Sequence, residues 1–163
     1  MRGLVLLALL AAGVARAAEP ALTEAALTEG AVRAFASRQE AAWNAKDARA
    51  FAATFTPDAV FVAQARDSNG GVTSNGQSTL PQAVAQARRF FAHSRFTEMG
   101  VVDRVIVAPD GRSARVVGHQ RTLVETAGQP ARTLCAETEQ TVVLTKGRIL
   151  SRGQTDTDVR CRR

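Results

Sequence analysis

The chain has 163 residues, of which 45% are hydrophobic and 22% charged, and its formal net charge is +6. This length suits one domain with a substantial core rather than two, and the composition excludes a disordered or fibrous chain. The arginines are spread along the sequence instead of clustering with aromatic residues, which argues against a nucleic-acid partner. The charge predicts no more than a weak preference for anionic ligands or surfaces.

Residues 1–17 have the layout of a secretory signal peptide. Arg2 gives a positive start, residues 3–15 form an uncharged core rich in Leu and Ala, and Ala15-Arg16-Ala17 places small residues where a signal peptidase reads them. The core is too short to cross a bilayer, and no later apolar run is long enough. We therefore predict a periplasmic or secreted protein without stable membrane insertion, in which a lead-in at 18–29 precedes one domain at 30–163.

The mature chain opens with two helical patterns. Apolar residues recur at the spacing of one buried helical face and predict a first helix that ends near residue 46; they are Val32, Phe35, Ala36, Ala42 and Trp43. Asp47 is a candidate N-cap for a second helix over 48–55. The segment 58–63 then reads as a strand, and the Gly- and Asn-rich stretch 66–79 as a loop with room for a short hairpin.

A third helix and four long strands complete the pattern. Ser78 or Thr79 can cap a helix that runs to about His93, with Pro81 in its first turn. The hydrophobic period then changes to two and predicts strands near 97–108, 112–126, 131–145 and 148–160. Three N-terminal helices packed on one face of a curved antiparallel sheet give an α+β fold.

The two cysteines, Cys135 and Cys161, favour a disulfide over two free thiols in an oxidising compartment. They flank the last predicted hairpin. If Thr145 pairs with Arg148, Cys135 lies opposite Asp158, so a β-bulge or a curled C-terminal tail must supply the offset. Neither cysteine is a candidate nucleophile, since the chain has no Cys-x-x-Cys motif.

Two segments and one glycine carry a resemblance to a known family. Ala42-Trp43-Asn44-Ala45-Lys46-Asp47 ends the first helix, Phe55-Thr56-Pro57-Asp58-Ala59-Val60-Phe61-Val62 enters the first strand, and Gly76 precedes the third helix. With the closing strands, they resemble the nuclear transport factor 2-like superfamily, in particular its bacterial SnoaL-like and DUF4440-like members. The resemblance implies a cone-shaped fold with a deep, mostly apolar pocket. Because members include isomerases, cyclases, dehydratases and dimerisation modules, the resemblance selects no single function.

Candidate chemical residues are few. The chain has no Tyr, the usual hydrogen-bond donor beside a general-base carboxylate in ketosteroid isomerase-like sites. We name His119 and Glu137 as candidate catalytic residues, and Trp43, Phe55 and His119 as the ligand pocket. The alternatives are a surface or structural His119 and a Trp43 that only packs in the core.

Two acid-x-acid pairs lie in the predicted strands. Glu137 and Glu139 share one face of theirs, and Asp156 and Asp158 share one face of the last strand. A pair on the concave side would lose water, and one pKa would rise. A pair on the convex side would balance arginines of neighbouring strands. The many strand arginines favour the convex placement.

No cluster has metal-ligand spacing and no loop has the pattern that cradles phosphates, so neither a metal nor a cofactor is expected. Three functions remain open. The preferred one is an exported domain that binds a small apolar or amphipathic molecule in its pocket. The alternatives are an acid–base enzyme (an isomerase, dehydratase or cyclase) that works without a cofactor and a homodimeric interaction module.

Overall fold

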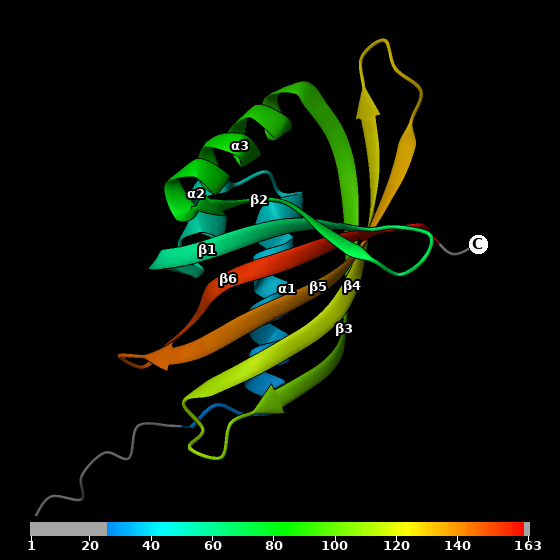
Figure 1. The fold of residues 1–163 in the computed structure, drawn as a ribbon. Coiled ribbons are helices and arrows are strands. Elements are labelled where there is room, and N and C mark those ends of the chain that lie inside the picture. Colours follow the sequence, from blue (N-terminus) through cyan, green and yellow to red (C-terminus); the bar gives the residue numbers. More distant parts are fainter. Residues whose placement is uncertain (1–25, 162–163) are drawn as a thin grey trace, which may run out of the picture.

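The computed structural model describes residues 26–161 (Figure 1), so the predicted signal peptide and most of the lead-in lie outside the described residues. In chain order the elements are α1 (Glu29–Asn44), α2 (Ala48–Ala52), β1 (Phe55–Arg66), β2 (Val72–Thr79), α3 (Leu80–His93), β3 (Ser94–Val107), β4 (Ser113–Thr126), β5 (Arg132–Thr145) and β6 (Arg148–Val159). The fold is α+β. Among the described residues, no helix is long and apolar enough to cross a membrane.

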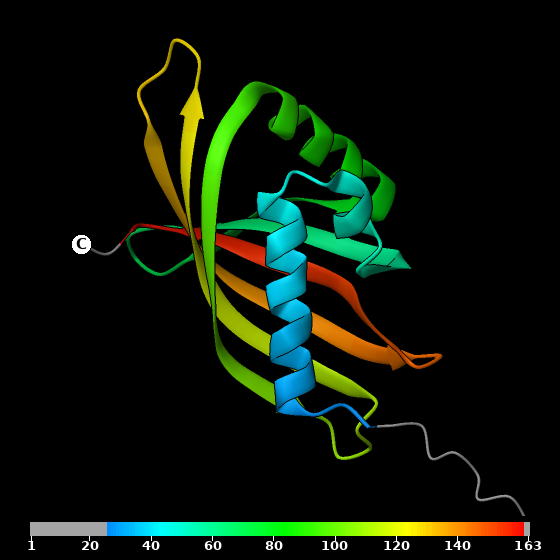
Figure 2. The same cartoon turned by 180° about the vertical axis from the view of Figure 1, so that it is seen from behind.

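The strands form one curved six-stranded sheet in the order β2-β1-β6-β5-β4-β3. α1 crosses its concave face, and α2 and α3 cover one end of that face (Figures 1 and 2). Neighbouring strands are antiparallel except β1 and β6, which are parallel. The prediction of an antiparallel sheet is therefore wrong at this pair. Turn signals report only strands that follow each other in the chain, whereas β1 and β6 come from its two ends.

The helices begin where the sequence predicts. Asp47 caps α2, because its Oδ1 accepts from the N–H groups of Arg49 and Ala50 at 3.0 and 2.9 Å. α3 follows Thr79, whose N–H donates to Gln82 Oε1 at 2.9 Å, and it ends at His93. Two details differ: α2 is three residues shorter than expected, and α3 comes after β1 and β2, so the helices are not one N-terminal block.

The polar stretch 66–79 is a hairpin rather than a loop. β2 pairs with β1 along its length, and Asp67 closes the turn by accepting from the N–H groups of Asn69 and Gly71, both at 2.8 Å. Gly70 supplies the positive φ of 87° that this turn needs. β2 is thereby an edge strand that adds one wall to the interior.

Two packed clusters hold the helices on the sheet. The first is a buried hydrophobic core between α1 and the central strands, formed by Leu27, Val32, Phe35, Ala114, Val116 and Val142. The second is aromatic: Trp43 lies with its ring centroid 4.9–6.1 Å from the rings of Phe51, Phe90, Phe91 and Phe96. The second cluster fixes the end of α1 against α2, α3 and β3.

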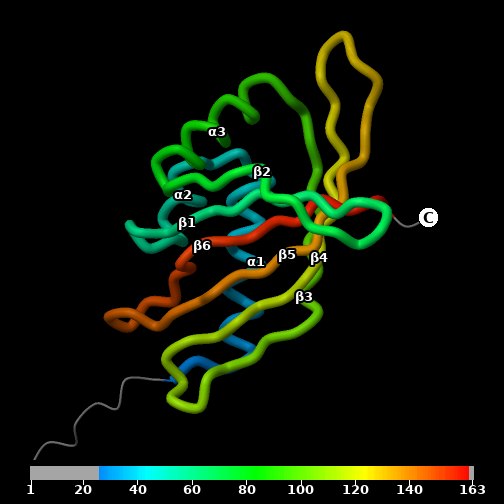
Figure 3. The backbone as a smooth tube through the Cα atoms, in the orientation of Figure 1, coloured from blue at the N-terminus to red at the C-terminus, as the bar shows by residue number. Residues whose placement is uncertain are grey.

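The predicted disulfide is present. Cys135 and Cys161 are bridged, with their Cα atoms 5.3 Å apart. A register shift between Gln140 and Val142 moves the pairing by one residue, so that Cys135 lies opposite Val159. The bulge and the short tail together supply the expected offset. The bridge ties the end of β6 to β5, below the β4–β5 hairpin that extends past the other strands (Figure 3).

Candidate functional site

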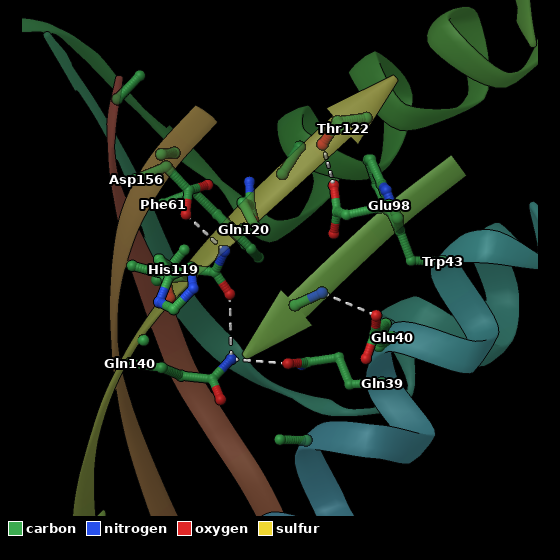
Figure 4. Close-up of a pocket in the computed structure, with 18 of the residues that line it drawn as sticks. Gln39, Glu40, Trp43, Phe61, Glu98, His119, Gln120, Thr122, Gln140 and Asp156 are labelled. Carbon is green, nitrogen blue, oxygen red and sulfur yellow. Dashed lines mark hydrogen bonds between the residues drawn. The ribbon is translucent and has the colours of Figure 1, made fainter. Parts of the chain in front are cut away.

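A cavity of about 1080 Å³ lies on the concave side of the sheet, partly open to solvent and walled by α1, α3 and strands from both halves of the sheet. Its lining is mixed. Aromatic surface comes from Trp43, Phe51, Phe61 and Phe90, amide groups from Gln39, Gln120, Gln140 and Gln154, and carboxyl groups from Glu40, Glu98, Asp156 and Asp158. Figure 4 shows the polar side chains that face its interior.

Glu98 is the first unusual carboxyl. It lies on β3 opposite Thr122 of β4, whose Oγ1–H donates to Glu98 Oε2 at 2.9 Å. The pKa of Glu98 is raised to about 7. Burial is the largest cause, the hydrogen bond from Thr122 offsets part of the rise, and the negative charges of Asp156 and Glu40 add to it. At neutral pH this side chain therefore exists as both acid and carboxylate.

Trp43 lies beside Glu98 (Figure 4). The aromatic cluster holds its ring, and its buried Nε1–H lies close enough to Glu98 to lower the pKa of that carboxyl slightly. The indole N–H makes no hydrogen bond of good geometry among the described residues. A buried donor without an acceptor costs about 1–3 kcal/mol. Trp43 and protonated Glu98 thus offer two donors to an oxygen atom of a bound molecule.

Asp156 is the second unusual carboxyl, on β6. The pairing of Gly118, Thr138 and Asp156 across three strands places it on the concave face. Burial raises its pKa to about 6; the amide of Gln154, donating to Oδ1 at 2.6 Å, lowers it, and the charge of Asp158 raises it. Near neutral pH, Asp156 is mostly a carboxylate with its charge held away from water, which suits a general base.

A chain of amides fixes the surroundings of Asp156. Gln140 Nε2 donates to Gln154 Oε1 at 3.3 Å and to Gln39 Oε1 at 2.8 Å. Gln39 Nε2 in turn donates to Thr54 Oγ1 at 2.9 Å. Because Gln140 donates to the Oε1 atoms of both Gln39 and Gln154, the Nε2 of Gln154 is left to donate to Asp156. Gln39 connects this arrangement to α1 (Figure 4).

Of the two residues named from sequence as catalytic, Glu137 does not line the cavity and His119 lies at its border. His119 and Glu137 are directly opposite each other on β4 and β5, but they interact with other residues. His119 Nδ1 is 2.9 Å from Asp103 Oδ2, with its side chain 55% exposed, and Glu137 forms an ion pair with Arg66 at 2.7 Å. His119 borders the cavity, while its neighbours Gly118 and Gln120 are the ones that face inward by strand alternation.

Only one of the two other residues expected in the pocket lines the cavity. Trp43 lines the cavity, whereas Phe55 is buried one layer behind the wall. Its ring packs against Phe51 and Phe61, with centroids 5.0 and 4.8 Å away, and these two rings line the cavity in its place. Phe55 therefore supports the wall without reaching the interior.

The two acid-x-acid pairs lie on opposite faces of the sheet. Glu137 and Glu139 lie on the convex face as favoured; Glu139 pairs with Arg115 at 2.5 Å, and this hydrogen-bonded guanidinium holds the pKa of Glu139 below its usual value. Asp156 lies on the concave face, contrary to that expectation. Glu98 was missed, because nothing in its local sequence distinguishes it from a surface carboxylate.

Among the residues that the structure describes, no group of three or more His, Cys, Asp and Glu side chains could hold a metal ion. The side chains that the cavity offers for chemistry are the carboxyl groups of Glu98 and Asp156 and the hydrogen-bonding groups of Trp43, Thr122 and the amides.

The curved six-stranded sheet with helices across its concave face defines the fold class of this domain. The chain belongs to the SnoaL-like domain family, whose model matches residues 24–152. Among curated proteins, none matches this sequence.

Solved structures share the fold at low sequence identity. A conserved protein from Planctomyces limnophilus is 14% identical, with a TM-score of 0.65 over 80% of this chain and 95% of that one. A ketosteroid isomerase-like protein from Erwinia carotovora is 14% identical, with a TM-score of 0.61 over the same shares. The beta subunit of benzoate 1,2-dioxygenase from Burkholderia mallei is 13% identical, with a TM-score of 0.66 over 82% and 91%. These likenesses establish the fold, which belongs to the nuclear transport factor 2-like superfamily.

Proposed function

We propose that the cavity is an acid–base catalytic site for a small amphipathic molecule that carries a carbonyl group. The observation that carries the proposal is the placement of Glu98 and Asp156 in one cavity, with pKa values raised to about 7 and about 6. Carboxyl pairs whose environments give them different pKa values near neutrality are suited to act as acid and base.

The proposed step is proton abstraction next to the carbonyl. The carboxylate of Asp156 takes a proton from the carbon beside the carbonyl, and the electron pair of that C–H bond forms the enolate. Protonated Glu98 and the Nε1–H of Trp43 donate hydrogen bonds to the enolate oxygen, which stabilises the developing charge. Asp156 then returns the proton to the same or another carbon, so the net reaction is an isomerisation or exchange that consumes no other reactant.

Two further features support this proposal. The cavity volume of about 1080 Å³ is in the range of small-molecule sites, and its mixture of aromatic and amide surface suits an amphipathic ligand. One structure of the same fold is named a ketosteroid isomerase-like protein, which is consistent with acid–base chemistry on a carbonyl compound; at 14% identity this is analogy only.

The test is α-proton exchange of 2-tetralone in D₂O, followed by NMR. We expect the protein to accelerate deuterium uptake over buffer, and Asp156→Asn to lower the rate at least about 100-fold. Glu98→Gln, which keeps a donor but cannot be an acid, should lower it less. Glu139→Gln is the matched control on the convex face and should exchange like the wild type. An Asp156→Asn variant with the wild-type rate would remove the proposed base.

Binding without catalysis is the second candidate, favoured by the continuous aromatic wall of Trp43, Phe51, Phe61 and Phe90. Trp43 is the one Trp of the sequence, which has no Tyr, so intrinsic fluorescence reports this wall alone. A saturable change of Trp43 fluorescence with 2-tetralone, together with exchange no faster than in buffer, would favour a binding protein.

We also propose that the domain works outside the cytoplasm. The disulfide between Cys135 and Cys161 supports an oxidising compartment, in agreement with the signal-peptide pattern of residues 1–17. Fractionation of expressing cells, with the mass of the mature protein, tests this. We expect an extracytoplasmic species that starts near Ala18, and a cytoplasmic, full-length species would contradict it.

The homodimer remains a prediction. Its support is an exposed apolar strip on the convex face, where Met99, Val101 and Leu123 are 60%, 49% and 46% exposed. Native mass spectrometry of the wild type and of Val101→Asp tests it: we expect a dimer that the aspartate converts to monomer, and a wild-type monomer would contradict it.

A further inference from the structure

Two glutamates on the convex face form ion pairs with arginines, whereas the carboxyl groups that line the cavity form none among the described residues. On the convex face, Glu137 pairs with Arg66 at 2.7 Å and Glu139 with Arg115 at 2.5 Å. The four carboxyl groups that line the cavity have no cationic partner within ion-pair distance among the described residues; they are Glu40, Glu98, Asp156 and Asp158.

The basic side chain that lines the cavity does not compensate them. The guanidinium of Arg33 is 2.8 Å from Glu29 Oε1 through Nε, and its Nη1 donates to the carbonyl of Val102 at 2.6 Å. His119, at the border, is directed to Asp103. The interior is therefore acidic in a protein whose net charge is +6. Burial removes much of the water from Glu98 and Asp156, Glu40 is half-buried and Asp158 is exposed. Four carboxyl groups around one cavity, without a cation paired to them, favour a positive charge supplied by a ligand.

The lining selects an organic cation over a metal ion. No three ligating side chains within the described residues come close enough to hold a metal. Aromatic rings of Trp43, Phe51, Phe61 and Phe90 line the same cavity and offer surface for an apolar body, as well as π-electron faces that attract cations. The Nε1–H of Trp43, which makes no hydrogen bond of good geometry among the described residues, is available to donate to an acceptor atom on the ligand.

We propose that the molecule bound in this cavity carries a positively charged amine on an apolar body, with a separate oxygen that accepts a hydrogen bond. This inference rests on the proposed function for the position of the oxygen, next to Glu98 and Trp43. The amine is attracted by the carboxylates that have no role in proton transfer. Glu40 comes from α1, where its Oε1 accepts from Gly100 N–H at 2.9 Å. Asp158 comes from β6, opposite Ala136 on the concave face.

Three probes of equal shape and different charge test the proposal. 4-[(Dimethylamino)methyl]acetophenone is cationic, 4-isobutylacetophenone is its neutral isostere, and 4-acetylphenylacetate is an anion of similar size. Trp43 fluorescence and calorimetry give the affinities. We expect the amine to bind at least about tenfold more tightly than the isostere, and the anion to bind most weakly. Added salt should reduce the difference in affinity between the amine and its neutral isostere.

Single substitutions test which carboxylates attract the amine. Glu40→Gln keeps an oxygen for Gly100 N–H, and Asp158→Asn is close in shape to the native side chain, so both should fold. Each should weaken amine binding several-fold and leave the neutral isostere unchanged. Glu139→Gln, the convex-face control, should change neither affinity.

Equal affinity for the amine and the isostere, or tighter binding of the anion, would overturn the proposal, as would absence of binding by all three. The outcome is separate from that of the exchange assay. If the amine binds selectively but 2-tetralone does not exchange, this inference stands and the proposed acid–base step is refuted. If 2-tetralone exchanges but the amine is not preferred, the acid–base step stands and this inference is refuted.

Discussion

Glu98 makes the stability of the protein depend on pH near neutrality. Its pKa in the folded protein is about 7 against an ordinary 4.5, so between these values the folded state binds more protons than the unfolded state. The contribution of Glu98 to the free energy of unfolding is therefore fully present below about pH 4.5 and is lost as pH rises through 7. For Glu98 alone the fall is up to about 3 kcal/mol.

Glu98→Gln should flatten this pH dependence. We expect the free energy of unfolding of the variant, measured with urea at pH 5 and pH 8 (about the two sides of the window), to change less than that of the wild type. The remaining slope comes from Asp156, whose pKa is also raised. Glu139, whose pKa is lowered, acts only at more acidic pH, so Glu139→Gln is the control. Parallel curves for Glu98→Gln and wild type would refute the raised pKa.

His119 provides a second test at this scale. Its imidazole faces Asp103 on the convex side and is more than half exposed. We expect His119→Ala to keep the 2-tetralone exchange rate and the Trp43 fluorescence response within about twofold of wild type. A loss of exchange of tenfold or more (about 1.4 kcal/mol in barrier height) would return His119 to the catalytic role that its sequence position first suggested.

At the scale of elements, the contact between β1 and β6 depends on a glycine. Gly153 has φ of 130°, and a Cβ there would collide with the backbone of Val60. Gly153→Ala should therefore lower the free energy of unfolding by at least about 2 kcal/mol. Gly30→Ala is the matched control, because nothing lies within 4 Å of the added atom. Urea denaturation measures both, and equal stability of the two variants would contradict this packing.

Local signals predicted the ends of elements well, because caps and turns act over a few residues. Asp47 and the Thr79–Gln82 pair fix helix starts, and the turns place β3 to β6 nearly where they lie. The face of the sheet on which a strand residue lies could not be predicted from such local signals. Glu137 and Asp156 sit in similar acid-x-acid patterns, and only the register across three strands, with the bulge at Gln140, turns one outward and the other inward.

At the scale of the whole molecule, the distribution of charge matters more than its sum. The net charge of +6 suggested a preference for anions, yet the cavity is lined by four carboxyl groups, and the excess of basic residues lies elsewhere. Composition cannot separate an interior from an exterior, because that separation depends on how the sheet curves around the helices. The raised pKa values of Glu98 and Asp156 have the same origin, since burial is their largest cause.

The most direct test of the acid–base site is a ¹³C NMR titration of the carboxyl carbons. The signals of Glu98 and Asp156 are assigned by their loss in Glu98→Gln and Asp156→Asn. We predict that Glu98 titrates with an apparent pKa of about 7 and Asp156 with one of about 6, while the carboxyl of Glu139 titrates below its ordinary value. Titration of both Glu98 and Asp156 at the ordinary values of exposed carboxyl groups would show that water reaches them freely, and the acid–base site described above would not exist.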